Sequence, residues 1–424
     1  MMLDKLAHKN KHLYAIIMTK EKLIMKTNRH LIWFLVLHLI INSVYNFGHP
    51  VTPQYINNIA APIYMTGVLF GVMALAQFIF APLWGQISDI FGRKIAFIGP
   101  LGYAIGQLGF VLFSDPTMLL IFRFIAGAFA VITATVHFAY VSDKSSLQNR
   151  AKYLGIAALL LPIGVFFGYT IGGFLGDVFS PRLTFLIQAI ASFFMAIIMY
   201  FFIDSPKREN AKITNIKWNV IKEDLALLQR NRDTALKYIL LITFLTIISY
   251  QLIISQAAVI LTNGFNKTTT YVGLFIAIYN LLAGITTFFI QKQILKSKKS
   301  NIKYLPYLSL CSIFSSLTAF MIILKIPFIM WLGLMGTTML NTIFIAQIQD
   351  IITKVDKHNE KGALIGLNQA MQSLGMFAGT IGAGLLVAQN IFSPLLLGTC
   401  LFILTFIINQ FVVKKKLEQH IIQT

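Results

Sequence analysis

The chain has 424 residues, of which 57% are hydrophobic and 12% are charged, and its mean hydropathy is +0.73. A soluble protein carries about 25% charged residues, so this composition excludes a cytosolic enzyme and a secreted domain. A membrane span needs about 20 apolar residues, and the chain is long enough for twelve spans. We therefore expect a multi-pass protein whose solvent is the lipid bilayer.

The apolar runs predict twelve spans, at 31–53, 63–84, 95–113, 117–141, 153–176, 182–203, 238–261, 271–290, 305–324, 328–349, 365–387 and 393–413. The polar stretch 204–237 separates an N-terminal bundle (31–203) from a C-terminal bundle (238–413). The tails are 1–30 and 414–424. Translation could start at Met1 or at Met25, because Lys20-Glu21 could be encoded as a ribosome-binding sequence; the alternative is an ordinary cytoplasmic tail.

The formal net charge of +20 is a topology signal. The basic residues gather in the two tails and in alternate loops, whereas the other loops hold only Arg182, Lys267 and Lys325. By the positive-inside rule, this alternation places both termini and the central loop in the cytoplasm of a cell (inner or plasma) membrane. We therefore expect no nucleic-acid partner. Two isolated cysteines, in apolar runs, indicate neither a disulfide framework nor a metal site.

The two halves repeat each other. A shift of 207 residues places Asp143 on Asp350, Gly168 on Gly375 and Gly172 on Gly379. Duplicated six-span halves predict a transporter that binds its substrate near the midplane, between the halves.

The most specific motif lies in the loop between spans two and three, where the chain reads GQISDIFGRK from Gly85 to Lys94. A glycine permits a tight turn, and a carboxylate is stabilised at a helix N-terminus. This loop resembles the signature loop of the major facilitator superfamily. The resemblance implies that Asp89 docks near residues 362–366 and that Arg93 pairs with Asp143. The conformational latch it predicts comprises Gly85, Asp89, Gly92, Arg93, Lys94, Asp143 and Arg150.

Span four contains Arg123 about 10 Å inside its outer end, at 1.5 Å per residue. A buried charge is costly and usually faces a protein interior or an aqueous cavity; the alternative is that the side chain snorkels to the headgroups. The sequence RFIAG resembles the span-four motif of the same superfamily, in which the arginine is associated with proton coupling.

Span five has glycines at four-residue spacing, a pattern that permits close helix packing. They resemble the antiporter motif of drug:proton antiporters, in which a proline stands where this chain has Tyr169. Pro162 could supply the kink instead. The matching glycines are Gly164, Gly168, Gly172 and Gly173.

Two further spans extend the resemblance. Span one ends in Pro50-Val-Thr-Pro53, and span eleven reads GLNQAMQSLG from Gly366. Both are similar to twelve-span drug exporters, and span eleven is similar to Gram-positive quinolone and multidrug efflux proteins. The resemblance implies an all-α membrane protein with the major facilitator fold, two pseudo-symmetric six-helix bundles.

Polar and aromatic positions inside the spans predict a mainly uncharged cavity. For any single residue the alternative is a hydrogen bond between helices; as a set they suit amphipathic ligands. The candidates are Asn42, Asn46, Phe129, Tyr169, Gln251, Gln256, Asn341 and Asn368.

All 15 carboxylates lie outside the span cores. The chain therefore lacks the buried acid that many drug exporters use to bind cations and exchange protons, and the coupling candidates are Arg123, His38 and His137. Histidine titrates near pH 6.5, which permits a histidine relay. We expect neutral, zwitterionic or weakly acidic substrates.

The function that these features favour is export of amphipathic small molecules (drugs) by proton antiport and alternating access. The alternative of the same fold is a sugar or metabolite exporter. A membrane enzyme or receptor is disfavoured because the sequence has no nucleophile–base pair and no metal-spaced cluster. We expect no cofactor, a small-molecule substrate, protons and the bilayer as partners, and a monomer.

Overall fold

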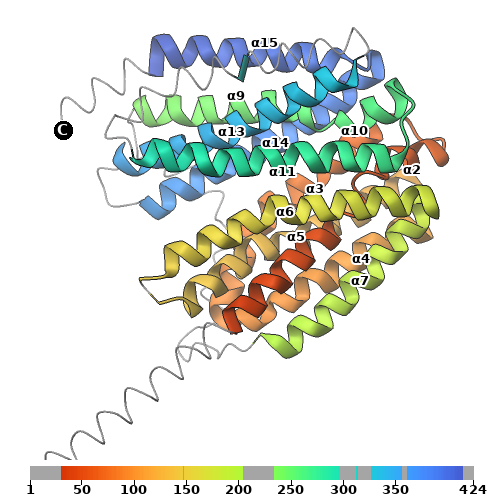
Figure 1. Cartoon of the computed structure of the whole chain (residues 1–424), viewed down its shortest axis with the longest axis horizontal. Coiled ribbons are helices and arrows are strands. Elements are labelled where there is room, and N and C mark those ends of the chain that lie inside the picture. The colour runs from red at the N-terminus through yellow and green to blue at the C-terminus, as the bar shows by residue number, and fades with distance from the viewer. Residues whose placement is uncertain are drawn as a thin grey trace, which may run out of the picture.

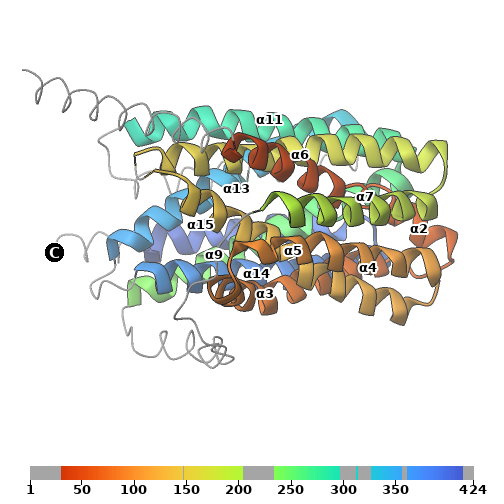
Figure 2. The same cartoon turned by 90° about the horizontal axis from the view of Figure 1, so that it is seen from below.

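The computed structural model describes residues 30–146, 148–203, 234–296, 312–313, 326–355 and 361–413. In this part of the chain, ten helices are long and apolar enough to cross a membrane, and a shorter apolar helix, His30–Tyr45, precedes them. The helices run side by side along one direction (Figures 1 and 2). The predicted all-α membrane architecture is confirmed. The span predicted at 305–324 lies almost wholly outside the described residues, as do the tails and nearly all of the linker, so the predicted domain boundaries stay predictions.

The N-terminal half contains the helix His30–Tyr45, α2 (Thr52–Asn58), α3 (Met65–Phe91), the 3-10 turn η1 (Arg93–Phe97), α4 (Ile98–Leu112), α5 (Pro116–Lys144), α6 (Arg150–Val178) and α7 (Pro181–Phe202). The C-terminal half contains α9 (Thr234–Ile254), α10 (Ala257–Val259), the π-helical turn η3 (Ile260–Gly264), α11 (Thr269–Lys296), α13 (Pro327–Val355), α14 (Lys361–Gln389), α15 (Ser393–Ile408) and the π-helical turn η6 (Asn409–Val413).

Local sequence explains where these helices begin. The Asp115 carboxylate accepts a hydrogen bond from the Met118 N–H at 3.0 Å, and the Ser180 hydroxyl accepts one from the Leu183 N–H at 3.1 Å. Each cap is followed directly by a proline, whose missing N–H costs nothing in the first turn. Capping and proline together fix the starts of α5 and α7.

Two spans differ from the predicted continuous helices. The first helix ends at Tyr45, a series of turns follows, and α2 begins only at Thr52. Pro50 explains the interruption, because proline lacks a donor and restricts the residue before it. Span seven breaks after Ile254 and continues through α10 and η3.

The two halves meet through two pairs of helices that the internal repeat relates to each other. Helix α3 packs on α14, where a Cβ added to Gly67 would lie 2.5 Å from the Cα of Gly384. Helix α6 packs on α11, where a Cβ added to Gly173 would lie 3.1 Å from the Cα of Gly273. A shift of 206 residues, which places Gly67 on Gly273, relates α3 to α11, and the shift of 207 residues relates α6 to α14, so the second interface repeats the first at the level of helices. Small residues allow these close approaches.

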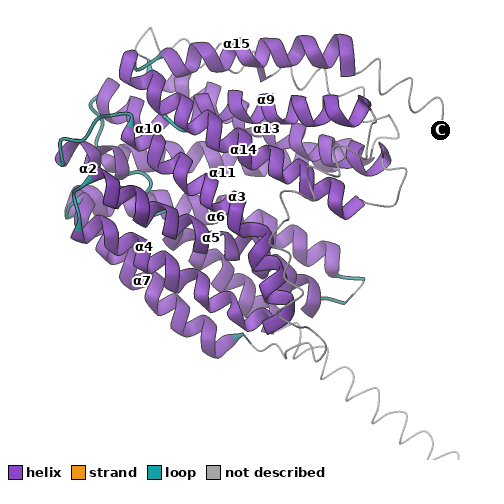
Figure 3. Ribbon diagram, turned by 180° about the vertical axis from the view of Figure 1, so that it is seen from behind, coloured by secondary structure: helices purple, strands orange, loops and turns teal. Residues whose placement is uncertain are grey.

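The bundle has two distinct ends. We call the end that holds His30, Phe91 and Ile408 the terminal end, and the end that holds Asn58, Val178 and Thr269 the closed end. The halves converge at the closed end and diverge toward the terminal end (Figures 1 and 3).

The packing around the glycines also differs between the closed end and the terminal end. Those at the interfaces described above lie toward the closed end and are tightly packed. By contrast, the position of an added Cβ has no atom within 4 Å at Gly85, Gly155 and Gly366, which lie toward the terminal end of α3, α6 and α14. The structure is therefore closed at one end and open at the other.

The outer surface is apolar, as a bilayer requires. Phe174 of α6 and Phe194 and Phe201 of α7 are 56%, 57% and 80% exposed. Such large exposed apolar side chains along span-length helices mark the lipid-facing side of the bundle.

Candidate functional site

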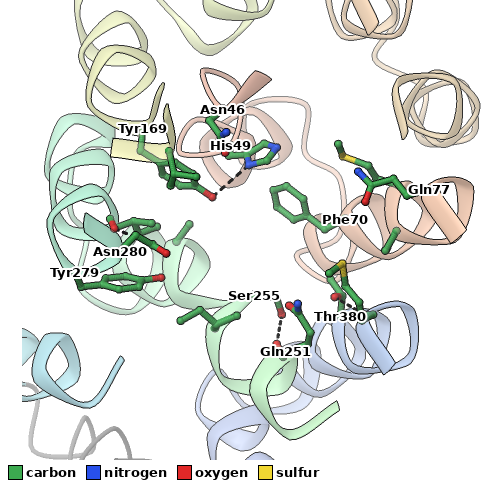
Figure 4. A pocket seen from close by; sticks show the side chains of 17 residues that line it. Asn46, His49, Phe70, Gln77, Tyr169, Gln251, Ser255, Tyr279, Asn280 and Thr380 are labelled. Atoms are coloured by element: carbon green, nitrogen blue, oxygen red, sulfur yellow. Dashed lines mark hydrogen bonds between the residues drawn. The ribbon is translucent and has the colours of Figure 1, made fainter. Parts of the chain in front are cut away.

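A cavity of about 430 Å³ lies between the two halves (Figure 4). Its walls are mixed, with seven polar residues, two tyrosines and eight apolar side chains. The N-terminal half contributes Asn46, His49, Phe70, Met73, Ala74, Gln77, Val165 and Tyr169, and the C-terminal half contributes Gln251, Ile254, Ser255, Ala258, Ile276, Tyr279, Asn280, Met376 and Thr380. A volume and composition of this kind suit a small amphipathic molecule.

The end of the first span and α6 build one wall together. Asn46 lies one turn after Asn42 and donates a hydrogen bond to the Asn42 carbonyl at 2.8 Å. Farther on, His49 lies in the turns before Pro50, with its Nδ1 3.3 Å from the Tyr169 hydroxyl (Figure 4). The His49 ring also packs edge-on against Phe70, with 5.1 Å between ring centroids. Tyr169, which replaces the proline of the antiporter motif, thus reaches across the wall to His49.

The break in span seven forms part of the opposite wall. The Ser255 hydroxyl donates to the Gln251 carbonyl at 2.6 Å, at the point where α9 ends. A serine that bonds back to the preceding turn competes with the helix backbone and promotes a bend. The bend places Gln251 and Ser255 on the cavity (Figure 4).

Three of the predicted cavity residues, Asn46, Tyr169 and Gln251, line this cavity. Two others pack between helices of the N-terminal half. Asn42 donates to the His38 carbonyl at 2.7 Å and lies against Gly164. The Phe129 ring contacts Trp84, with 5.5 Å between centroids, and fills the space beside Gly102. These two residues therefore serve helix packing, although the hydrogen bond of Asn42 lies within one helix and does not join two helices.

The remaining three candidates are also buried away from this cavity. Gln256 and Asn368 have no exposed surface, and Asn341 is 7% exposed. The Asn341 Oδ1, the Gln256 Oε1 and both side-chain amide atoms of Asn368 lack a hydrogen-bond partner in the described part of the chain.

Several other residues that line the cavity are not among the eight selected candidates, although the polar ones belong to the set of span positions that predicts the cavity. His49, Gln77 and Asn280 are polar positions inside spans, so the polarity signal was present but did not separate them from packing residues. Phe70 and Tyr279 carry no such signal, because an aromatic residue in a span is usually packed in the core or against lipid.

Arg123 lies one side chain behind the cavity. It has no exposed surface, and its guanidinium stacks over Phe70 at 4.8 Å and over Phe110 at 5.6 Å from the ring centroids. None of its three side-chain nitrogens has a hydrogen-bond partner among the described residues. The side chain thus points into the protein and does not snorkel to the headgroups.

His38 and His137 form a buried pair between the first helix and α5. Each is 1% exposed, and their Nδ1 atoms lie 3.0 Å apart. A hydrogen bond between two imidazole nitrogens requires one to carry the proton and the other to accept it. A neutral pair with one Nδ1–H and one bare Nδ1 satisfies this requirement, and Phe34 and Phe138 pack against the two rings.

The glycines of the antiporter-type helix serve two neighbours. An added Cβ would collide with Asn42 at Gly164, with Asn46 at Gly168 and with Phe47 at Gly172, all in the first span. Gly173 faces Thr269 of α11 instead. Pro162, inside α6, lies against Gly284 of α11, 2.9 Å from the position of its added Cβ. One helix therefore packs tightly within its own half and against the other half.

The signature loop forms a compact polar cluster at the terminal end. Arg93 is 8% exposed and donates to Asp143 at 2.8 Å and to Ser88 at 2.5 Å, and it pairs with Asp89 at 2.9 Å. The Arg93–Asp143 contact is the one that the resemblance implied. Gly92 has φ 84°, a conformation that strongly favours glycine, and this turn redirects the chain from α3 into η1.

The predicted docking of Asp89 differs from what the structure shows. Asp89 is 52% exposed at its side chain and contacts Arg93. Gly366 has open space beside it, and the side chains at 361–363 lie outside the described set. The terminal end is open here, which separates α3 from α14 at this end.

Two other predicted latch residues also lie at the terminal end. Lys94 lies 4.3 Å from the Tyr200 ring centroid, and the buried Nε of Arg150 has no partner among described residues.

The closed end carries a contact between the halves that the sequence did not predict. The Asp177 carboxylate, at the end of α6, accepts hydrogen bonds from the Thr269 N–H at 2.9 Å, the Thr270 N–H at 2.8 Å and the Thr269 hydroxyl at 2.6 Å. It thereby caps the N-terminus of α11 in the other half. A carboxylate at a helix N-terminus is stabilised by unpaired N–H groups.

No group of three or more His, Cys, Asp or Glu side chains that could hold a metal ion occurs in the described ranges.

The family model of the Major Facilitator Superfamily matches residues 33–380. The chain belongs to the major facilitator superfamily. It is a multi-pass membrane transporter with the major facilitator fold, and not an enzyme.

Two curated proteins match part of this major facilitator chain. The class H tetracycline resistance protein of Pasteurella multocida is 34% identical over 165 residues, which cover 38% of this chain and 41% of that protein. Multidrug resistance protein 1 of Bacillus subtilis is 32% identical over 171 residues, or 40% and 44% of the two chains. The chain thus spans less than half the length of these relatives.

Among solved structures, a bacterial homolog of the human lysosomal transporter Spinster, in an inward-facing and unoccupied conformation, superposes with a TM-score of 0.73. The likeness covers 93% of this chain and 98% of that one at 14% identity. At this identity it shows the shared major facilitator fold.

Proposed function

We propose that this transporter exports amphipathic small molecules across the cell membrane in exchange for protons, by alternating access. The observation that carries the proposal is the cavity of about 430 Å³ between two halves that are packed at one end and apart at the other. Rocking of the halves about such a site gives access from each side in turn. The names of the two partial relatives, a tetracycline and a multidrug resistance protein, support export of drugs.

The positive-inside rule orients the molecule in this proposal. Basic residues gather in the loops of the terminal end, beside Arg93, Lys144 and Arg150, and in both tails. The terminal end and both termini are then cytoplasmic, and the structure is open to the cytoplasm, ready to take up cargo for export. Each chain contains a complete cavity, so we propose that a monomer is sufficient for transport.

The His38–His137 pair is the proposed proton carrier. In the neutral pair, one Nδ1–H donates to the other Nδ1 across 3.0 Å. A further proton on the accepting nitrogen would put an N–H on both Nδ1 atoms and one positive charge on the pair, so the Nδ1–Nδ1 hydrogen bond would be lost unless the neutral ring moved its own proton to Nε2. In this proposal, the gain of a buried charge on proton uptake moves the first helix relative to α5.

This movement has a direct route to the cargo. The first helix packs against Gly164 and Gly168 of α6, and its extension carries Asn46 and His49 into the cavity wall. A shift of this helix on protonation changes the cavity, which is the coupling that antiport requires.

The second candidate is a sugar or metabolite exporter of the same fold. The four carboxamides Asn46, Gln77, Gln251 and Asn280 on the cavity favour it, because sugars bind through such donors and acceptors. The aromatic and aliphatic part of the wall, including Phe70 and Met376, favours an amphipathic ligand. Lipophilic compounds should therefore be exported better than sugars.

A susceptibility panel tests the cargo class. A pump-deleted host that overexpresses the chain should tolerate amphipathic antibiotics better than the empty host, and an uncoupler should abolish the gain. Unchanged tolerance together with export of radiolabelled sugars would replace the proposal with the second candidate.

Proton exchange is tested in inverted membrane vesicles that hold a pH gradient. Adding an amphipathic drug should release protons from vesicles with the wild-type chain, and His38→Gln combined with His137→Gln should abolish this release. His30→Gln is the matched control, because His30 stacks on Phe202 at the terminal end, away from the pair. Proton release that survives the double substitution, with ethidium as the drug, would refute the histidine carrier.

A further inference from the structure

The electric charge around the cavity is unbalanced. No acidic residue lines the cavity in the part of the chain that the structure describes. Among the acidic residues whose side chains the structure describes, Asp89, Asp143 and Asp177 lie within three residues of the ends of their spans. Arg123, in contrast, lies seven residues inside α5, completely buried.

The guanidinium of Arg123 is separated from the cavity by a single layer of side chains. Phe70 lines the cavity, and the guanidinium of Arg123 lies over the same ring, 4.8 Å from its centroid. The His49 ring lies edge-on to Phe70, and His49 Nδ1 is 3.3 Å from the Tyr169 hydroxyl. This wall, Phe70, His49 and Tyr169, thus stands between a buried cation and the cargo space.

Two unsatisfied groups in this region are complementary to an anion. The three side-chain nitrogens of Arg123 have no hydrogen-bond partner among the described residues, and neither does the buried Nε2 of His49. Rings supply only a weak cation–π interaction, and burying a guanidinium without a countercharge costs several kcal/mol. A negatively charged ligand in the cavity would supply that countercharge.

We propose that the cargo of this cavity is an amphipathic organic anion, with an apolar or aromatic body and one carboxylate or sulfonate. The anionic group lies against the wall of Phe70, His49 and Tyr169, where Arg123 attracts it through the ring layer. The carboxamide groups of Gln77 and Gln251 offer N–H donors to its oxygens, and the aliphatic wall receives its body. The inference rests on the proposed function, in that this cavity carries the cargo.

The expected selectivity follows from Coulomb's law. Opposite unit charges on the order of 10 Å apart, at an effective dielectric constant of about 20, attract enough to favour the anion over a neutral isostere on the order of tenfold. A cation of the same shape is disfavoured by a similar factor. The site therefore discriminates by charge and tolerates differences in the apolar body.

A matched series of three probes tests the proposal. Naphthalene-1-sulfonate, naphthalene-1-sulfonamide and 1-naphthylmethylammonium share one ring system and are anionic, neutral and cationic. Their equilibrium binding to the purified full-length protein, in a neutral detergent and without a pH gradient, should rank anion first and cation last. Equal affinities, tighter binding of the cation, or absence of anion binding would overturn the proposal without any substitution.

Substitutions then assign the preference to Arg123. Arg123→Gln should bring the affinities for sulfonate and sulfonamide to within about threefold of each other, while Arg123→Lys keeps the preference. Arg182→Gln is the matched control, because Arg182 is an exposed arginine at the closed end that bonds Ser114, and it should leave the ranking unchanged. Sulfonamide binding reports that each variant is folded. An anion preference that survives Arg123→Gln would overturn the role of Arg123.

The outcome is separable from that of the proposed function. Loss of proton exchange in vesicles with intact anion selectivity in detergent would refute antiport alone. Proton-coupled export of lipophilic cations, with no preference for the sulfonate, would refute the anion proposal alone.

Discussion

The cap that Asp177 places on α11 should control how firmly the closed end is shut. Asp177→Asn keeps one acceptor oxygen for Thr269 but replaces the oxygen that accepts from the Thr270 N–H at 2.8 Å with a donor, and it removes the charge. A charge-assisted hydrogen bond contributes about 1.5–3 kcal/mol, and the charge at a helix N-terminus about 0.3–1 kcal/mol. The carboxylate is exposed and solvent screens it, so we take the low end, about 2 kcal/mol in total.

A change of about 2 kcal/mol alters the ratio of closed to open molecules roughly 30-fold. Spin labels at Asn58 of α2 and Gln389 of α14, which are exposed at the closed end of opposite halves, report the separation by electron paramagnetic resonance. The labels require a background in which Cys311 and Cys400 are replaced by serine. The wild type should give one short distance, and Asp177→Asn should add a longer one. Asp177→Ala, which removes all three bonds, should increase it further.

Asp115→Asn is the matched control for this experiment. Asp115 also caps a helix N-terminus at the closed end, that of α5, but both partners lie in the same half. Its substitution should therefore leave the distance between the labels unchanged. Identical distance distributions for the wild type, Asp177→Asn and Asp177→Ala would refute the idea that this cap holds the halves together.

Three further substitutions test the packing that surrounds the site. Gly67→Leu should force the same labels apart, because even its Cβ would lie 2.5 Å from the Gly384 Cα. Gly85→Leu is the control and should not move the labels, because no atom lies within 4 Å of its added Cβ. Equal effects of the two substitutions would contradict the packing argument. Gly92→Ala should destabilise the protein by about 1–3 kcal/mol, because φ there is 84°; a thermal unfolding midpoint as high as that of Gly85→Ala would speak against strain at this turn. Asp143→Asn removes the charge partner of Arg93 at a half-exposed position, so the midpoint should fall slightly, by the equivalent of about 0.5–1 kcal/mol, and an unchanged midpoint would show that the ion pair contributes nothing.

The fold could be predicted because the bilayer imposes a strong constraint on sequence. A run of apolar residues must become a helix that satisfies its own backbone groups, so α5, α6 and α7 lie within a few residues of their predicted spans. The sequence did not predict where a span is interrupted. Thus the span predicted at 31–53 stops as a helix at Tyr45.

The cavity was harder to predict because one signal has two meanings. A polar residue in a span either faces the cavity, as Gln251 does, or bonds within the bundle, as Asn42 does. Which of these holds depends on the rotation of each helix and on the packing of its neighbours. Neither can be derived from the few residues around the position. The Asp177 cap joins segments that are 92 residues apart in the sequence, and no sequence motif predicts it.

At the closed end, Asn57 meets Asn263: each side-chain amide nitrogen donates to the other's carbonyl oxygen, at 2.9 and 3.3 Å. Their separation of 206 residues is the offset between the two repeats, so each asparagine faces its own counterpart across the pseudo-twofold axis. A carboxamide can bond to a copy of itself because it offers both a donor and an acceptor, as isologous contacts in homodimers require. The contact therefore has the form of an isologous dimer contact, although both partners belong to a single polypeptide.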